Sequence, residues 1–251
     1  MTGDALAFTD SVGNRITKEE LSKSNGSFNY TIIGAGNISQ EAIVAHEEGR
    51  RYASAGDYDR AFAKFSEAIQ HSPEWPYPVY DLAYSYLLQD DYVNALKYYK
   101  LTDSLAPKGF FTSKVALYTL TGEKMGKFKP GLYKMYVSLE SLLSDTEREE
   151  MTKVLVSTFP DFAPGWKEYA NFLAGEQRLA AIETGLKLDC DVQTSGTLLI
   201  NKALFLANEE KKSEAKEILT DVIFNPESTL GNIELAKFAL NNLLEAKTDD
   251  K

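Results

Sequence analysis

The residues that most often carry out catalysis are scarce in this sequence. It contains two histidines, His46 and His71, and a single cysteine, Cys190. The repeat described below would place the histidines on different helices, and this set has no zinc-ligand spacing. Cys190 has no cysteine–histidine motif around it. We therefore expect no metal ion, no cofactor and no enzyme. An enzyme with an unrecognised site stays as an alternative, which would need a pocket where His46 meets carboxylates.

Other candidate clusters favour ordinary surface roles. The segment Gly34-Ala35-Gly36-Asn37 is too short for a phosphate-binding loop and precedes no matched lysine. A lysine-rich loop at 124–129 could contact an acidic partner, but a solvated loop is favoured. For His46, a solvated or hydrogen-bonded role is favoured over ligand binding.

The charge of the chain restricts its partners. The net charge is −10 and the isoelectric point is near 4.9, which argues against nucleic acid and against anionic membrane surfaces. A lone cysteine allows no intrachain disulfide, which fits a reducing compartment. We see no signal peptide and no apolar run of 18 residues, so we expect no membrane partner and a cytoplasmic protein.

Residues repeat their types at a spacing of 34 in the first half of the chain. The matching pairs are Gly49/Ala83, Tyr52/Tyr86, Tyr58/Tyr92, Ala61/Ala95, Phe65/Tyr99 and Pro73/Pro107. A fixed period of this size is typical of stacked-repeat architectures, in which one unit cannot bury its apolar face alone. Such proteins usually act as binding surfaces.

The repeats must be built from helices. We expect about twelve, paired as antiparallel hairpins, with breaks at Gly56-Asp57 and Asp90-Asp91 and a helix beginning at Pro76. Residues 1–40 form a non-repeat arm, with a helix start at Thr17 and an extended run over 28–33. We divide the remainder into two regular repeats (41–109), an irregular helical repeat with an extra helix (110–160), and degenerate repeats with a capping helix (161–250).

The segment 42–109 resembles two consecutive tetratricopeptide repeats. The resemblance lies in the small residue and aromatic of the first helix, the alanine and aromatic of the second, and the closing proline. Markers of the same pattern recur more weakly at Trp166, Ala203 and Pro226. Segments such as Trp75–Pro78 are also similar to bacterial proteins. The resemblance implies an all-α, right-handed solenoid of helical hairpins with a short N-terminal arm.

The resemblance also implies where a ligand would bind, because the first helix of each hairpin lines the concave side of such stacks. Within 76–89, Tyr77, Tyr80 and Tyr84 fall on a stripe away from the core stripe, which contains Tyr86. We expect a tyrosine-floored groove flanked by Arg50 and Lys114. Its residues are Ile43, His46, Arg50, Tyr77, Tyr80, Tyr84, Phe111, Lys114 and Tyr118.

The expected function is non-catalytic protein or peptide binding, as an adaptor or scaffold. The two cations would favour an acidic segment or a C-terminal carboxylate. One alternative is that the 1–40 arm or tight curvature covers the groove; another is a scaffold that associates with a second copy. A weaker second site is a carboxylate clamp like that of chaperone-binding tetratricopeptide proteins, formed by Lys167, Asn171 and Asn201. The cations of its third repeat are missing, because Gly231 and Leu235 stand near their places.

Overall fold

Two short strands precede the helices. The computed structural model describes residues 5–10, 28–33, 38–142 and 144–245. Strand β1 (Ala5–Asp10) pairs antiparallel with β2 (Phe28–Ile33), with Ala5 opposite Ile33 and Asp10 opposite Phe28. The extended run expected over 28–33 is thus confirmed. The helix start expected at Thr17 and the glycine segment 34–37 lie outside the described residues.

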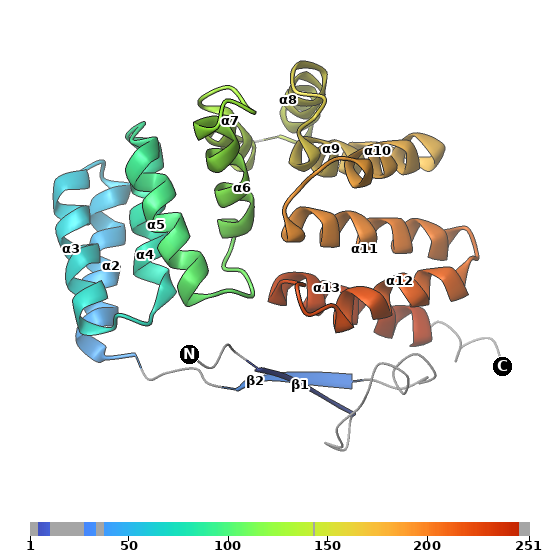
Figure 1. Cartoon of the computed structure of the whole chain (residues 1–251), viewed down its shortest axis with the longest axis horizontal. Coiled ribbons are helices and arrows are strands. Elements are labelled where there is room, and N and C mark those ends of the chain that lie inside the picture. Colours follow the sequence, from blue (N-terminus) through green and yellow to red (C-terminus); the bar gives the residue numbers. More distant parts are fainter. Residues whose placement is uncertain (1–4, 11–27, 34–37, 143, 246–251) are drawn as a thin grey trace. The chain divides into compact units, whose positions relative to one another are not determined.

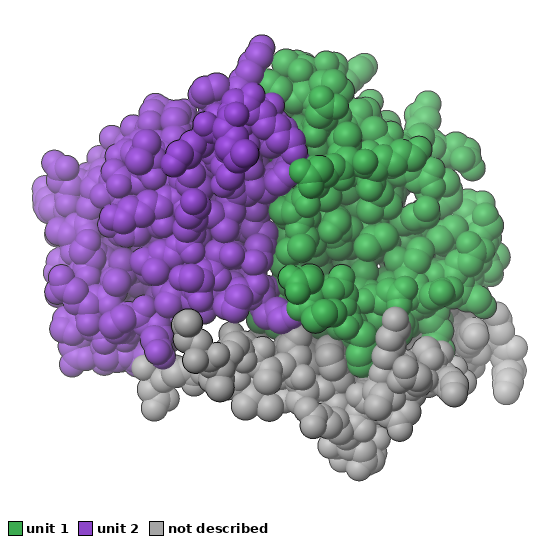
Figure 2. Space-filling view, viewed as in Figure 1, with its two compact units in different colours: residues 1–33, 139–251 green, residues 34–138 purple. Residues whose placement is uncertain are grey.

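The described chain divides into two compact units (Figure 2), which we describe separately. One is 34–138; the other groups 139–251 with 1–33. Neither the boundary expected at 109 nor that at 160 coincides with this division, and the finer division into repeats stays a prediction. Every described helix is too short or too polar to cross a lipid bilayer.

The unit 34–138 is a series of helices joined by short turns (Figure 1). They are α2 (Gln40–Ser54), α3 (Tyr58–His71), α4 (Pro76–Leu88), α5 (Tyr92–Leu105), α6 (Ser113–Lys124) and α7 (Leu132–Ser138). Side chains of Ser39, Asp57 and Asp91 accept hydrogen bonds from backbone N–H groups in the first turns of α2, α3 and α5. Pro76 occupies the start of α4, where its missing N–H costs nothing. The expected breaks are therefore confirmed.

Small residues let paired helices approach closely in this unit. A methyl group on Gly49 of α2 would lie 2.6 Å from the ring of Phe65 on α3. Ala61, Ala83 and Ala95 are fully buried at the matching places. Tyr52 and Tyr86 pack against the buried cluster of Ala61, Phe65 and Leu82. Helices α2–α5 thus form two consecutive helical hairpins, with small and aromatic residues at the contacts that the 34-residue period predicts.

The unit that contains 139–245 holds strands β1 and β2 and a second series of helices. Its helices are η1 (Leu139–Ser141), α8 (Asp145–Thr158), α9 (Ala163–Tyr169), η2 (Ala170–Phe172), α10 (Gly175–Lys187), α11 (Val192–Asn208), α12 (Lys212–Phe224) and α13 (Leu230–Glu245). Helix α8 is the extra helix expected at 145–158, and a capping box between Ser144 and Glu147 begins it. Helices α11, α12 and α13 share one core of buried aliphatic side chains. The twelve α-helices of the described residues equal the expected number.

Candidate functional site

The nine residues expected to form the groove all lie in the unit 34–138, on its three first helices or at their starts. They occupy three positions of the 34-residue period. The rows of equivalent positions are Ile43–Tyr77–Phe111, His46–Tyr80–Lys114 and Arg50–Tyr84–Tyr118. Successive first helices therefore place side chains of one row next to one another.

Aromatic rings form a continuous cluster along the first two rows. The ring centre of Phe111 lies 5.4 Å from that of Tyr77 and 5.2 Å from that of Tyr80. Phe110 contacts the same two tyrosines edge-on, at 5.5 and 5.7 Å. Tyr77 also meets His46 at 4.6 Å. We call Tyr77, Tyr80, Phe110 and Phe111 the aromatic surface.

Part of this region is open to solvent. Phe111 is 58% exposed and Tyr84 is 36% exposed, whereas Ile43, Tyr77, Tyr80 and Tyr118 are half-buried. The backbone of Phe111 has φ of +46°, a left-handed conformation that is uncommon for an aromatic residue. Residues held in this way often cluster at ligand-binding places.

His46 does not have the solvated position considered from the sequence. It is 3% exposed, and its Nε2 lies 2.8 Å from Oδ2 of Asp81 on the next first helix. The ring of Trp75 lies 4.8 Å away. His46 therefore has the hydrogen-bonded role. Its burial between two rings leaves little of its side chain for a ligand to contact.

The two cations expected to flank the groove each have a carboxylate of this chain beside them. Arg50 Nε lies 3.5 Å from Asp81, and its guanidinium stands over the Tyr77 ring at 5.5 Å. Lys114 Nζ is paired with Asp103 at 2.7 Å. An acidic ligand would therefore compete with Asp81 and Asp103 for these cations, and its binding stays a prediction.

Hydroxyl groups behind the aromatic surface hold its edge in place. Thr112 Oγ1 lies 2.8 Å from the hydroxyl of Tyr80 and 3.0 Å from that of Tyr133. Burial raises the pKa of Tyr133 and that of Tyr99 well above the ordinary range. Thr112 is thus fixed directly after Phe111.

Two residues of the region were not expected from the sequence. Asp81 organises His46 and Arg50, and Phe110 covers both tyrosines. Asp81 had a signal, because it is the single charged residue of an otherwise apolar and aromatic helix, α4. For Phe110, the only sequence signal was its position next to Phe111.

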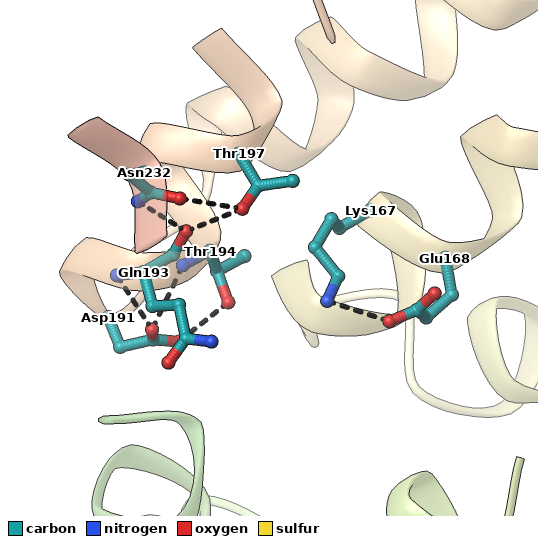
Figure 3. A network of polar contacts seen from close by, with 7 residues as sticks. All are labelled: Lys167, Glu168, Asp191, Gln193, Thr194, Thr197 and Asn232. Carbon is teal, nitrogen blue, oxygen red and sulfur yellow. Dashed lines mark hydrogen bonds and ion pairs between the residues drawn. The ribbon is translucent and has the colours of Figure 1, made fainter. Parts of the chain in front are cut away.

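The second expected site lies in the unit that contains 139–245. Lys167 Nζ is paired with Glu168 at 2.7 Å (Figure 3), Asn171 is exposed within η2, and Asn201 is 8% exposed on α11. A clamp needs its lysine and both amides available together. The pairing of Lys167 and the burial of Asn201 do not favour one, and the clamp stays an untested prediction.

Possible metal ligands and the thiol of Cys190 are the other reactive groups that the sequence raised. Among the described residues, no three His, Cys, Asp or Glu side chains come together as metal ligands would. Burial, reinforced by Asp191 and Asp189, raises the pKa of the Cys190 thiol to about 11. A thiol with so high a pKa is a poor nucleophile near neutral pH.

No protein-family model and no curated protein matches the chain. Solved structures resemble it in fold. MamA from residue 41 to its end, from Desulfovibrio magneticus RS-1, is 13% identical with a TM-score of 0.35, covering 86% of this chain and 99% of that one. The MamA RS-1 ArsTM double mutant gives the same identity and TM-score and is covered completely.

A third similar structure is TTC0263, a thermophilic TPR protein of Thermus thermophilus. It is 18% identical with a TM-score of 0.32, over 79% of this chain and 98% of that one. None of these likenesses, all at TM-scores below 0.5, bears on what this chain binds.

Proposed function

We propose that this chain is a non-catalytic scaffold that binds a protein or peptide segment at the aromatic surface and the adjoining Arg50 and Tyr84. The observation that carries the proposal is the solvent exposure of Tyr84 on α4 and of Phe111 just before α6, within one compact unit. Large aromatic side chains left in water on the same stripe of first-helix positions are typical of recognition surfaces. Tyrosine adds a hydroxyl at little entropic cost.

An acidic segment or a C-terminal carboxylate remains one form of this proposal. Arg50 is the better candidate of the two cations, since its side chain is 58% exposed and that of Lys114 only 18%. Such a ligand would replace Asp81 as the partner of Arg50, and its binding would weaken as salt is added.

Affinity capture from a lysate of the source cells tests the proposal. The intact chain is compared with Arg50→Ala/Tyr84→Ala, which removes two exposed side chains and leaves the buried core untouched. Proteins retained by the intact chain and lost by the variant, identified by mass spectrometry, are the expected result. Circular dichroism establishes that the variant is folded.

A matched control separates this surface from exposed apolar side chains in general. Phe238 on α13 is 64% exposed and belongs to the other unit, so Phe238→Ala should retain the same proteins as the intact chain. If Arg50→Ala/Tyr84→Ala retains everything that the intact chain retains, the proposal is wrong. Light scattering on the purified chain tests the alternative of a self-associating scaffold, which predicts a mass of at least two copies.

A further inference from the structure

Within the aromatic surface, the side chain of Phe111 packs on the two tyrosines. Phe111 places its ring against Tyr77 and Tyr80 at 5.4 and 5.2 Å, tilted by 38° and 42°. These are ordinary distances for paired aromatic rings. The two tyrosines therefore already accept a phenyl ring, although this contact leaves more than half of Phe111 in water.

Phe111 holds this position at a conformational cost. Its φ of +46° is strained for a residue with a Cβ atom, and Phe110 and Thr112 on either side are restrained. The Phe110 N–H donates to Ser113 Oγ at 3.1 Å, and Thr112 lies between the hydroxyls of Tyr80 and Tyr133. Rotation of the Phe111 side chain would uncover the parts of both tyrosines that Phe111 contacts, without rearrangement of the loop, while Phe110 keeps its edge-on contacts with them.

The charges around this surface favour an uncharged ligand. Arg50 lies beside Asp81 and Lys114 beside Asp103. Residues 34–138 contain twelve acidic and twelve basic side chains, so this unit has no net charge to attract an ion. The ring contacts of Phe111 then indicate what fits best, which is another aromatic side chain.

We propose that Phe111 occupies, in the free protein, the place of an aromatic side chain of the partner, and that a partner segment binds by displacing it from Tyr77 and Tyr80. This rests on the proposed function and adds two things to it: an uncharged, aromatic class of partner residue and a surface masked by its own side chain. The apparent affinity is lowered by the fraction of molecules in which Phe111 covers the site.

Nuclear magnetic resonance titration of the intact chain tests the inference. The probe is N-acetylphenylalanine amide, and the matched probes are the leucine and aspartate analogues. The readout is the shift of the Tyr77 and Tyr80 amide signals. Phe111→Gly removes the ring and suits a positive φ, so it should bind the phenylalanine probe at least about five-fold more tightly than the unmodified chain. The aspartate probe should bind least.

Two further variants keep the test decisive. Phe111→Tyr retains a ring and should behave like the unmodified chain. If Phe111→Gly does not fold, Phe111→Asn tolerates the same backbone and should give the same gain. Weaker or unchanged binding by the ring-deleted variant, preference for the aspartate probe, or no shift at Tyr77 and Tyr80 in any chain would each overturn the inference.

The capture experiment distinguishes this failure from failure of the proposed function. One outcome is that some proteins are lost by Arg50→Ala/Tyr84→Ala without being retained more strongly by Phe111→Gly. That result would support the proposed function and contradict the masking of the tyrosines by Phe111. If Arg50→Ala/Tyr84→Ala loses nothing, the proposed function itself is wrong, whatever the probes show.

Discussion

At the scale of single residues, the absence of a Cβ atom at Gly49 sets how closely helices α2 and α3 approach. Gly49 faces the ring of Phe65, which is 1% exposed and enclosed by its own hairpin. The same repeat position holds Ala83 in the next hairpin, where the methyl group is fully buried. A buried ring cannot move aside cheaply, because protein interiors are close-packed.

We expect Gly49→Ala to lower the free energy of unfolding by about 1–2 kcal/mol, since overpacking exceeds the gain in helix propensity. Thermal and urea unfolding measure it. Gly231→Ala on α13 is the control, because a methyl group there meets nothing within 4 Å and should leave stability unchanged or raised. Equal behaviour of the two variants would contradict the packing argument.

Tyrosines buried in the unit 34–138 should make stability sensitive to alkali. Burial raises the pKa of Tyr99 and Tyr133 well above its ordinary value, and burial with a hydrogen bond to Asp90 raises the pKa of Tyr92 to about 12. These groups ionise near pH 10 when unfolded and at higher pH when folded. Their stabilising effect is therefore complete below about pH 10 and is lost as pH rises further.

The urea midpoint, measured at about pH 8, 10 and 11, should fall above about pH 10. Tyr99→Phe removes one of these groups and should reduce the fall. A midpoint that stays constant over this range, or a fall of the same size in Tyr99→Phe, would show that these hydroxyls do not control it.

Residue types predicted the core better than they predicted the site. The period of 34 identified Ala61, Ala95 and Phe65 because small and aromatic residues recur wherever helices touch in the same way. The contact between His46 and Asp81 joins two hairpins and has no counterpart in the period. A polar pair formed once, between residues 35 apart, leaves no repeated pattern to detect.

At the scale of elements, the side chain of Asn232 on α13 forms hydrogen bonds with α11, in addition to the apolar core that the two helices share. The Asn232 amide nitrogen donates to the Gln193 carbonyl at 3.0 Å, and its oxygen accepts from Thr197 at 3.0 Å (Figure 3). The same nitrogen donates to the Val192 carbonyl at 3.2 Å. Gly196 leaves the room, since a methyl group there would clash with the amide. The start of α13 is thereby fixed against the first turns of α11.

Asn232→Ala should lower the free energy of unfolding by about 1–3 kcal/mol, because three hydrogen bonds at this contact are lost and the carbonyls of Val192 and Gln193 each lose one of their donors. Denaturant titration measures the change. Asn242→Ala, on an exposed position of the same helix, is the control and should have little effect. If both variants lower the free energy of unfolding by a similar amount, the effect comes from substitution in α13 in general and not from the contacts of Asn232.

Helix boundaries were predictable where the chain carries strong local signals. Pro76, Asp57, Asp91 and Ser144 each act within one turn, so the sequence alone identifies the start that they mark. The start of the short helix α7 is held by contacts with Glu123, which accepts from the N–H groups of Gly131 and Tyr133. Those bonds span eight to ten residues and could not be predicted from local pattern.

At the scale of the whole molecule, the charge is unevenly divided. The unit 34–138 is neutral by residue count, so the net charge of −10 belongs entirely to the remainder of the chain. The aromatic surface lies in the neutral unit. The acidic composition, which argued against nucleic acid and anionic membranes, therefore describes residues outside the proposed binding surface.

A fragment of residues 38–138 should fold alone, since it contains complete hairpins with their own core. We expect a helical circular dichroism spectrum and one cooperative thermal transition. A fragment of residues 58–138, which lacks α2 and exposes the face of α3, is the control and should be less stable. Absence of a cooperative transition in 38–138 would show that this unit depends on the rest of the chain.

The half-buried thiol of Cys190 has a practical consequence for spectroscopy. With a pKa of about 11, only about one molecule in ten thousand carries the thiolate at pH 7, so maleimide dyes should react slowly there. A cysteine introduced at an exposed position, as in Ser104→Cys, should be modified first. A fluorophore or spin label can then be attached at a chosen place while the native cysteine is retained.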